Sequence, residues 1–267
     1  METIQLKNII GNLGDNAFTS TTPNKCLTND GYYIVKFAEN KEGIKVLINE
    51  YIVHEICTLI SINTPKAALI QIPTKFHDVK LGDDAVTIEP GLAFGSKIIP
   101  QVSVFFSHKQ IQDVMNPITL FDMILLDHII DNRDRDTNPR NILFCREDGM
   151  VYLIDHERVF GAGSCWDCYS LKNSAPIDEI KNFIDSTSVY SHIRPYHDFD
   201  RLIEVSAVKF KVVTKQSLHD IIYNVPSEWG LSIQDKDGLI EYLHARFLQI
   251  DYLVDLLKMH SKGGIKK

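Results

Sequence analysis

The stretch Asp134-Arg-Asp-Thr-Asn-Pro-Arg-Asn141-Ile-Leu-Phe144, with Val151-Tyr-Leu-Ile-Asp155 after it, decides how this chain is interpreted. A carboxylate, an amide shortly after it and a second carboxylate further along supply three short, hard oxygen groups. Hard oxygens suit Mg²⁺, which keeps several waters and takes one or two protein carboxylates together with substrate phosphates. The stretch therefore predicts a magnesium site.

The residues between the amide and the last carboxylate predict a β-hairpin. Residues 142–144 and 151–154 are apolar runs of strand type, and residues 147–149, Glu-Asp-Gly, have the composition of a tight turn. Such a hairpin brings Asn141 and Asp155 together at its open end. Both side chains are then placed to bind one metal ion.

Length and composition limit the class of protein. At 267 residues the chain is long enough for one large domain or for two lobes. Apolar residues make up 44% of it and charged residues 24%, which predicts a folded protein. The net charge of -7 argues against a dedicated nucleic-acid site, because phosphate affinity rests on clustered Lys and Arg.

The chain shows no export or membrane signal. No apolar run is long enough for a membrane span, and the N-terminus lacks the pattern of a secretory signal. The five cysteines are an odd, scattered number and do not suggest a disulfide framework, and Cys165-Trp-Asp-Cys168 fits a loop better than a zinc site. We expect a soluble, cytoplasmic protein with no membrane span.

Two regions with different patterns follow one another. Up to about residue 35 the chain fits loop and hairpin turn; after this come three strands, at 32–37, 67–72 and 84–88, and one amphipathic helix at 43–60. Helical patterns dominate later, at 117–130, 177–186, 199–205, 214–222 and 238–259, the last being the longest. The sequence predicts an α+β, bilobal architecture, with a small β-rich N-lobe at 1–90 and a mainly helical C-lobe at 91–267.

The chain offers a candidate for each task of phosphoryl transfer, which needs a positioned metal, a cation on the nucleotide phosphates and a base near the acceptor hydroxyl. Asn141 and Asp155 are the expected Mg²⁺ ligands. Lys36, on its strand, is the expected phosphate-binding cation. Glu50 on the following helix is the first choice for orienting Lys36, and Glu55 is the second.

A weaker signal lies in the first segment. Thr19, Ser20 and Thr21 belong to a stretch rich in hydroxyl groups, which offers hydroxyls and backbone N–H groups to nucleotide phosphates as a glycine-rich loop does. The chain has no glycine-rich loop of the usual form. These three residues are the expected additional cofactor-binding group.

Several blocks of the sequence resemble those of known protein families. Arg135-Asp136-Thr-Asn-Pro-Arg-Asn141-Ile-Leu resembles the catalytic loop of protein kinases, in which an Arg-Asp pair precedes a Pro and a metal-binding Asn. The same loop is similar to that of aminoglycoside phosphotransferases. Several blocks, in order over most of the chain, resemble the HipA-like kinase family more closely: Tyr33-Ile-Val-Lys-Phe37, Leu47-Ile-Asn-Glu-Tyr51, Gly91-Leu-Ala-Phe-Gly-Ser96, Asn132-Arg-Asp-Arg135, Leu153-Ile-Asp-His156 and Val225-Pro-Ser-Glu-Trp229.

This resemblance implies an ATP-dependent kinase with a two-lobed, protein-kinase-like fold related to the phosphoinositide kinases. It implies that Lys36 and Glu50 anchor the nucleotide and that Asp155 binds the metal. One departure concerns the base. The family usually has Asn-x-Asp-Arg-His, with the metal-binding Asn at a spacing that falls here on Pro139.

Two aspartates therefore compete for the role of catalytic base. Either Asp134 keeps it, with a short insertion before Asn141, or Asp136 takes it at the usual spacing. We prefer Asp136, because its spacing lets both side chains converge on one metal and one acceptor without remodelling the loop. Asp134 remains the alternative.

The predicted function is ATP- and Mg²⁺-dependent transfer of the γ-phosphoryl group to a hydroxyl, of a protein Ser/Thr as the resemblance implies, or of a small molecule. One alternative is a nucleotide-binding pseudokinase or interaction module, paired with a protein partner such as an antitoxin. The irregular register of Asp134 and Asp136 is the reason for considering it. The other alternative is an enzyme of the same fold that transfers AMP.

Overall fold

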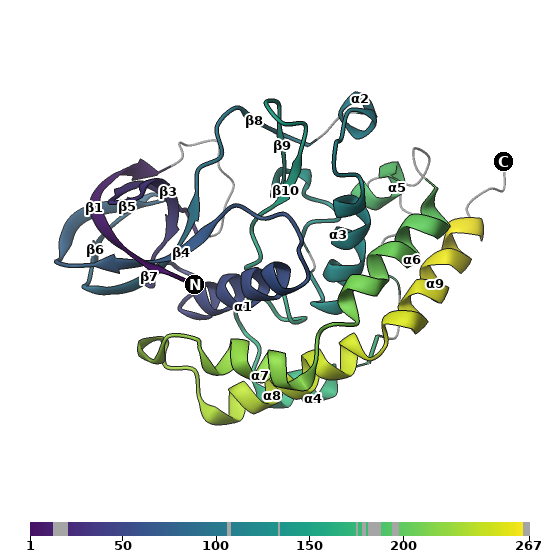
Figure 1. Cartoon of the computed structure of the whole chain (residues 1–267). Coiled ribbons are helices and arrows are strands. Elements are labelled where there is room, and N and C mark those ends of the chain that lie inside the picture. Colours follow the sequence, from purple (N-terminus) through teal and green to yellow (C-terminus); the bar gives the residue numbers. More distant parts are fainter. Residues whose placement is uncertain are drawn as a thin grey trace.

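The computed structural model describes residues 1–12, 21–105, 108–132, 134–174, 176–177, 180, 188–193 and 198–263. A β-rich N-terminal part lies beside a helical C-terminal part (Figure 1). The chain is therefore of the mixed α+β class that the sequence predicts.

Five strands of the N-terminal part close into a barrel. In spatial order they are β1 (Thr3–Asn12), β2 (Asn24–Thr28), β3 (Gly31–Lys36), β7 (Gly91–Lys97) and β4 (Ala67–Ile72). All neighbours are antiparallel except β1 and β4, which pair in parallel. Side chains alternate along a strand. On β3, Tyr33 and Val35 are buried in the barrel core, whereas Ile34 and Lys36 line a cavity on its other side.

The strands expected at 32–37, 67–72 and 84–88 correspond to β3, β4 and β6 (Asp84–Ile88), and β6 forms a separate hairpin with β5 (Phe76–Leu81). The expectation of only loop and turn before residue 35 was wrong, because β1 and β2 lie there. The turn between Thr28 and Gly31 is present as expected. β1 depends on parallel pairing with β4, a long-range partner that local sequence does not reveal.

Helix α1 (Lys45–Leu59) lies between the barrel and the helical part (Figure 1). It corresponds to the helix expected at 43–60. Ten of its residues are buried, and the buried set includes the polar residues Asn49 and Glu50. A carboxylate inside a protein is costly unless it is paired. The burial of Glu50 therefore points to a partner in the interior.

The helical part contains α2 (His108–Gln112), α3 (Ile118–Ile129), α4 (Cys168–Asn173), α5 (Val189–Ile193), α6 (Phe199–Phe210), α7 (Lys215–Tyr223), α8 (Ile233–Phe247) and α9 (Ile250–Gly263). The helices expected at 117–130, 199–205 and 214–222 correspond to α3, α6 and α7, and α6 runs further than expected. Most of the helix expected at 177–186 falls outside the described residues.

The single long helix expected at 238–259 was wrong, because the chain forms two helices there. α8 ends at Phe247, and α9 begins at Ile250. The backbone N–H of Gln249 donates to the carbonyl of Arg246, three residues back, which interrupts the regular pattern of α-helical hydrogen bonds. α8 packs on α4 and α7, whereas α9 packs on α6 and α3. The apolar spacing is helical on both sides of the break, so the sequence pattern runs through it unchanged.

The hairpin expected after Asn141 is present as β9 (Ile142–Cys145) and β10 (Val151–Leu153), with β8 (Val102–Val104) as a third strand. Ile142 pairs with Leu153, and the N–H of Ile154 donates to the carbonyl of Asn141 at 3.1 Å. Asn141 and Asp155 therefore lie side by side at the open end, as the sequence predicts.

The short turn η3 (Ser227–Trp229) ties the barrel to the helical part. The indole Nε1 of Trp229 donates to the carbonyl of Leu92 on β7 at 2.9 Å, and Glu228 accepts from the N–H of Leu92. The Trp229 ring also meets Tyr51 of α1 edge-on, with centroids 6.0 Å apart. These contacts bring α1 and β7 onto one docking point of the helical part.

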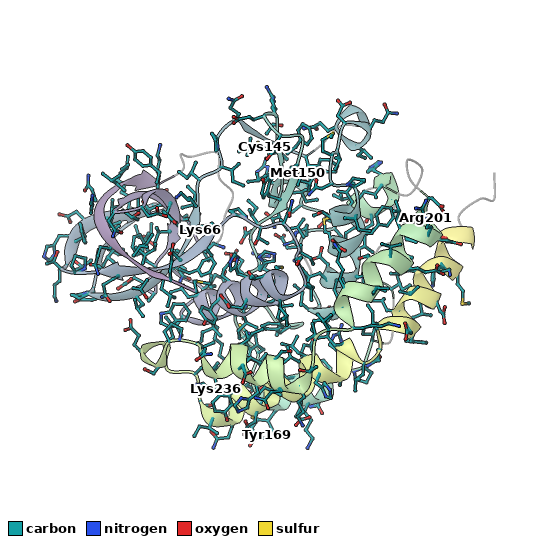
Figure 2. All side chains as sticks on the ribbon, viewed as in Figure 1. Lys66, Cys145, Met150, Tyr169, Arg201 and Lys236 are labelled. Atoms are coloured by element: carbon teal, nitrogen blue, oxygen red, sulfur yellow. The ribbon has the colours of Figure 1, made fainter. Side chains whose placement is uncertain are left out.

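The outer faces of the helical part carry exposed side chains. Exposed Tyr169 and half-buried Lys236 lie along the edge formed by α4 and α8, and exposed Arg201 lies on α6, away from the barrel (Figure 2). Within the described part of the chain, no helix is long and apolar enough to cross a membrane.

Candidate active site

A cavity of about 700 Å³ lies where the barrel meets the hairpin and the loop of residues 134–141. This volume is in the range of small-molecule sites. The side chains that line it include an apolar group, Ile34, Phe94, Ile98, Leu143 and Ile154, and a polar group, Lys36, Glu50, Asp134, Asn141, Asp155 and Glu157. The apolar group suits a flat ring system, and the polar group suits phosphates and a metal.

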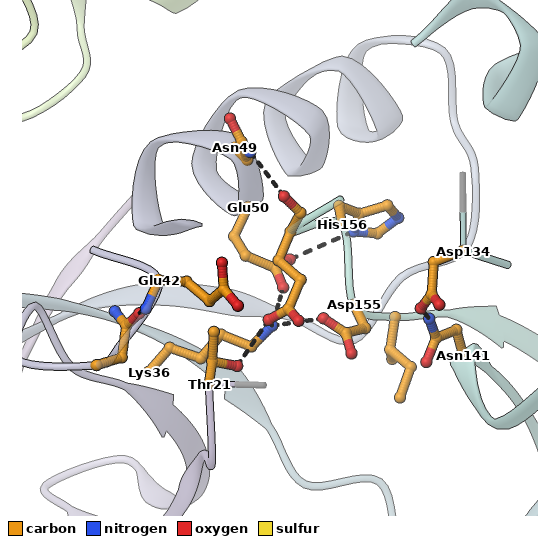
Figure 3. A network of polar contacts seen from close by, with 12 residues as sticks. Thr21, Lys36, Glu42, Asn49, Glu50, Asp134, Asn141, Asp155 and His156 are labelled. Atoms are coloured by element: carbon orange, nitrogen blue, oxygen red, sulfur yellow. Dashed lines mark hydrogen bonds and ion pairs between the residues drawn. The ribbon is translucent and has the colours of Figure 1, made fainter. Parts of the chain in front are cut away.

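Lys36 lies among the carboxylates of the polar group (Figure 3). Its Nζ lies 2.6 Å from Oε1 of Glu50, 2.5 Å from Oδ1 of Asp155 and 3.0 Å from Oε2 of Glu157. The lysine comes from β3, Glu50 from α1, and the other two carboxylates from the segment after β10. The pairing of Lys36 with Glu50 is the one expected from sequence. Glu55 instead faces the N-terminal amine, at 3.5 Å.

Burial and charge shift the acidities of this cluster in opposite directions. Burial alone lowers the pKa of Lys36, but attraction from the three carboxylates outweighs it and holds the pKa well above its ordinary value. Burial raises the pKa of Glu50, yet the charge of Lys36 prevails and the pKa is lowered. For Asp155, burial prevails over Lys36, with the neighbouring carboxylates adding to it, and the pKa rises to about 7.

The backbone at Asp155 is unusual as well. Its φ is 60°, in the left-handed region that non-glycine residues seldom adopt, although Asp tolerates it better than most. Such conformations persist where the surrounding structure imposes them, and they occur often at functional sites. Here the left-handed residue lies two positions after the end of β10 and places its carboxylate beside Lys36.

Glu157 is a site residue that the sequence analysis missed. Besides Lys36, its Oε2 accepts from the hydroxyl of Thr21 at 2.6 Å. Thr21 thus contacts a carboxylate of the cavity lining, and its binding to nucleotide phosphates stays a prediction. Thr19 and Ser20 lie outside the described residues. The signal for Glu157 in the sequence is a second acidic residue two positions after Asp155.

The loop of residues 134–141 places Asp134, and not Asp136, in the lining of the cavity. Nδ2 of Asn141 donates to Oδ2 of Asp134 at 2.6 Å, and Nδ2 of Asn138 donates to the same oxygen at 3.2 Å. Asp136 is buried and does not line the cavity, and its carbonyl accepts from the N–H of Val189 at 2.8 Å. The preference for Asp136 therefore lacks geometric support.

The physical reason is a turn that sequence spacing does not reveal. The N–H groups of Thr137 and Asn138 both donate to the carbonyl of Asp134, and the 3-10 turn η1 (Pro139–Asn141) follows. This turn accommodates the additional residues that separate Asp134 from Asn141 relative to the usual spacing in the family. It brings the Asn141 amide back to the Asp134 carboxylate.

A second charged cluster lies beneath the loop. Arg135 is fully buried, forms an ion pair with Asp127 of α3 and donates to the carbonyl of Ile154 at 3.0 Å. The other oxygen of Asp127 accepts from the hydroxyl of Tyr190 at 2.7 Å. Burial raises the pKa of Asp127 to about 6, against the opposing pull of Arg135. This cluster holds the loop in place and does not line the cavity.

Helix α1 is also fixed to the segment that follows Asp155. The Asn49 amide donates to the carbonyls of Glu157 at 2.7 Å and Gly163 at 2.9 Å, and its oxygen accepts from the indole of Trp166 at 2.8 Å. Lys45 lies over the Trp166 ring, 4.3 Å from its centroid. The position of Glu50 on α1 is therefore coupled to the segment that carries Asp155.

The donor set fits a magnesium ion. Asn141 and Asp155 present an amide and a carboxylate at one end of the hairpin, and Mg²⁺ typically takes one or two such ligands with waters and phosphates. Asp155 lines the cavity, and its Oδ2 has no hydrogen bond to the described residues. Three carboxylates face one lysine, so the cluster has an excess of negative charge that a further cation would neutralise. Within the described residues, no cluster of three or more His, Cys, Asp and Glu side chains forms a metal cage.

Fold and site together define a kinase-like protein. A family model described as HipA-like kinase matches residues 13–250, and the chain belongs to this family. The crystal structure of a Helicobacter pylori proinflammatory kinase, CtkA, is similar with a TM-score of 0.57 and 13% sequence identity, over 99% of each chain. At that identity the likeness concerns the fold alone. No curated protein matches the sequence. Family membership supports a phosphotransferase function.

Proposed function

We propose that this protein transfers the γ-phosphoryl group of ATP to a hydroxyl, with Mg²⁺, in the cavity between the barrel and the helical part. One observation carries the proposal. Lys36 from the barrel and Asp134, Asn141 and Asp155 from the helical part all line that single cavity. Phosphoryl transfer needs mainly positioning and electrostatic stabilisation, and these groups supply both.

In this proposal Lys36 binds the ATP phosphates near the reacting end. Glu50 orients it, as the 2.6 Å contact supports. When ATP binds, the phosphate oxygens replace Asp155 as partners of Lys36. Asp155 then turns to the metal, for which its open Oδ2 and its crowding by other carboxylates make it suited.

We assign the metal to Asn141 and Asp155, and the role of base to Asp134. A bound Mg²⁺ neutralises charge on the phosphate oxygens. Asp134 accepts a hydrogen bond from the acceptor hydroxyl and takes its proton as the new P–O bond forms. The bond between the γ-phosphorus and the bridging oxygen breaks, and ADP leaves. Asn141, which donates to Asp134 at 2.6 Å, holds that carboxylate in position.

The acceptor that we propose is a Ser or Thr hydroxyl of a protein, as the resemblance to HipA-like kinases implies. The apolar residues Ile34, Ile98 and Leu143 form the expected adenine site. Ile34 lies two residues before Lys36 on the same face of β3, so one strand supplies both a wall for the ring and the phosphate contact.

The test is Mg²⁺-dependent ATP consumption by the purified protein, followed by intact-mass analysis. The gain of one phosphoryl group on the protein or on an added acceptor supports the proposal. Lys36→Met should reduce turnover by about 10²-fold or more, because an electrostatic contact to the transferring group is lost. Arg146→Met, an exposed change on the hairpin turn, is the matched control.

Each other outcome rejects the proposal in a defined way. The gain of an adenylyl group identifies an AMP-transferring enzyme. ATP binding that requires Mg²⁺, without any turnover, identifies a nucleotide-binding pseudokinase. If ATP does not bind, the cavity is not a nucleotide-binding site.

A further inference from the structure

Two arginines line the same cavity as the catalytic groups. Arg140 directly precedes Asn141 in η1, and Arg158 follows Asp155 by three residues. Both side chains are exposed, whereas Lys36 and Glu157 are buried. The cavity therefore has an acidic interior around one lysine and a basic mouth.

Two lysines of the lining have partners outside the cavity. Lys97 pairs with Asp30 at 2.9 Å, and Lys25 lies over the ring of Tyr32, 4.8 Å from its centroid. For Arg158, by contrast, the described part of the chain offers no carboxylate within ion-pair distance. Its charge is available to a ligand at the mouth of the cavity.

The position of the two arginines favours the acceptor as that ligand. The nucleotide phosphates are matched by Lys36 and a metal in the interior. The acceptor hydroxyl has to reach Asp134 from outside, and Arg140 belongs to the same loop as Asp134. Arg158 also lines a second cavity of about 380 Å³, formed with Glu42, Val46, Glu157 and residues 161–165, so the acceptor chain has space on this side of Arg158.

We infer that the acceptor is an acidic peptide segment, in which carboxylate or phosphate groups flank the Ser or Thr hydroxyl and bind Arg140 and Arg158. This inference rests on the proposed function, since it assigns a substrate class to that site. The planar guanidinium fork binds carboxylate and phosphate in a bidentate way, which a lysine does not match. An acceptor flanked by Lys or Arg meets like charge at the mouth and is disfavoured.

The experiment uses four serine peptides of equal length, flanked by aspartate, by phosphoserine, by alanine or by lysine. Phosphorylation is measured as kcat/KM on the full chain with ATP and Mg²⁺. Binding of fluorescent versions of the same peptides is measured separately, in the presence of ADP and Mg²⁺. We expect the aspartate peptide to exceed the lysine peptide by about tenfold or more in both measurements, and the preference to weaken as salt is added. The phosphoserine peptide separates a preference for phosphate from one for carboxylate.

Charge reversal supplies the specific test. Arg140→Glu and Arg158→Glu should each reduce the ratio of aspartate-peptide to lysine-peptide use, and the double variant should bring it near one or invert it. Arg146→Glu on the hairpin turn and Arg201→Glu on α6 make the same charge change outside the cavity (Figure 2) and should leave the ratio as in the unaltered protein.

Three results overturn the inference: no preference for the aspartate peptide in the unaltered protein, a ratio that charge reversal at Arg140 and Arg158 leaves unchanged, or a rise in the KM for ATP that equals or exceeds the effect on the peptide. The last result assigns the arginines to the nucleotide. The failure of the proposed function is seen separately, as absent ATP binding or turnover, because peptide binding is read without turnover.

Discussion

The cluster around Lys36 draws its side chains from β3, α1 and the segment after β10, whereas the cluster around Arg135 lies wholly within the helical part. In the first, one lysine faces three carboxylates, so negative charge is in excess. In the second, Arg135 and Asp127 balance one another and Tyr190 completes the pair. Both are buried, so position alone does not distinguish them.

The difference in charge balance separates a site from a scaffold. A buried cluster with excess negative charge is costly unless a cation joins it, which suits a place where Mg²⁺ and a nucleotide bind. An arginine and a carboxylate that neutralise one another need no ligand, and here they hold the loop in place. We therefore expect changes in the Lys36 cluster to affect activity more than stability, and changes in the Arg135 cluster to do the reverse.

The largest expected effect concerns the two aspartates of the catalytic loop. Asp134→Asn should lower Mg²⁺-dependent ATP turnover by roughly 10² to 10⁴-fold, the usual range for a lost general base. Asp136→Asn should lower it by less than about tenfold, because that side chain is outside the cavity. Turnover of both variants, with circular dichroism as the folding control, decides the matter. A greater loss of turnover in Asp136→Asn than in Asp134→Asn would assign the role of base to Asp136.

The next largest effect is on stability. Arg135→Met leaves the Asp127 carboxylate buried without its ion-pair partner, and should lower the free energy of unfolding by about 3–5 kcal/mol. Urea unfolding measures it, with Arg146→Met as an exposed control expected to stay within about 0.5 kcal/mol. The double change Asp127→Leu with Arg135→Met should recover much of the loss. A cost below about 1 kcal/mol for Arg135→Met contradicts a scaffold role.

A smaller effect depends on pH. Burial lowers the pKa of His54 from 6.5 to about 4, so the folded state favours the neutral ring. That contribution is complete above pH 6.5 and is lost as the pH falls toward 4. We expect a loss of roughly 1–3 kcal/mol in the free energy of unfolding across this window. Urea unfolding at pH 7 and pH 5 measures this difference, which should be smaller in His54→Gln than in the unaltered protein. An equal difference in both proteins would assign the loss of stability to other groups.

The smallest expected effect sharpens the contrast between the clusters. Asp155→Asn removes one of three carboxylates around Lys36 and relieves their mutual repulsion. The free energy of unfolding should stay the same or rise by about 1 kcal/mol, although ATP turnover is lost. Thermal unfolding and turnover on the same sample test this. A drop of several kcal/mol means that Asp155 is a structural residue.

The sequence predicts those parts of the fold and site that depend on local pattern. The hairpin from Ile142 to Leu153 combines apolar runs with an Asp-Gly turn, and it sets Asn141 beside Asp155 as expected. Lys36 and Glu50 are also close in the chain, on a strand and the helix that follows it. Short-range pattern is sufficient for both.

What the sequence did not predict depends on distant partners or on the path of a turn. β1 pairs with β4, more than sixty residues further on, and Trp229 docks on Leu92 across the molecule. Asp134 rather than Asp136 lines the cavity because the N–H groups of Thr137 and Asn138 coil the loop back on the Asp134 carbonyl. Neither the spacing nor the composition of the loop contains that information.

The most direct measurement of the central claim is a crystal structure with Mn²⁺ in place of Mg²⁺ and a non-hydrolysable ATP analogue, with the metal located by its anomalous scattering. We predict one metal peak between Asn141 and Asp155, Lys36 on the phosphates and the terminal phosphate facing Asp134. A metal or nucleotide outside the cavity lined by Lys36 and Asp155, or a terminal phosphate that faces Asp136, contradicts the account.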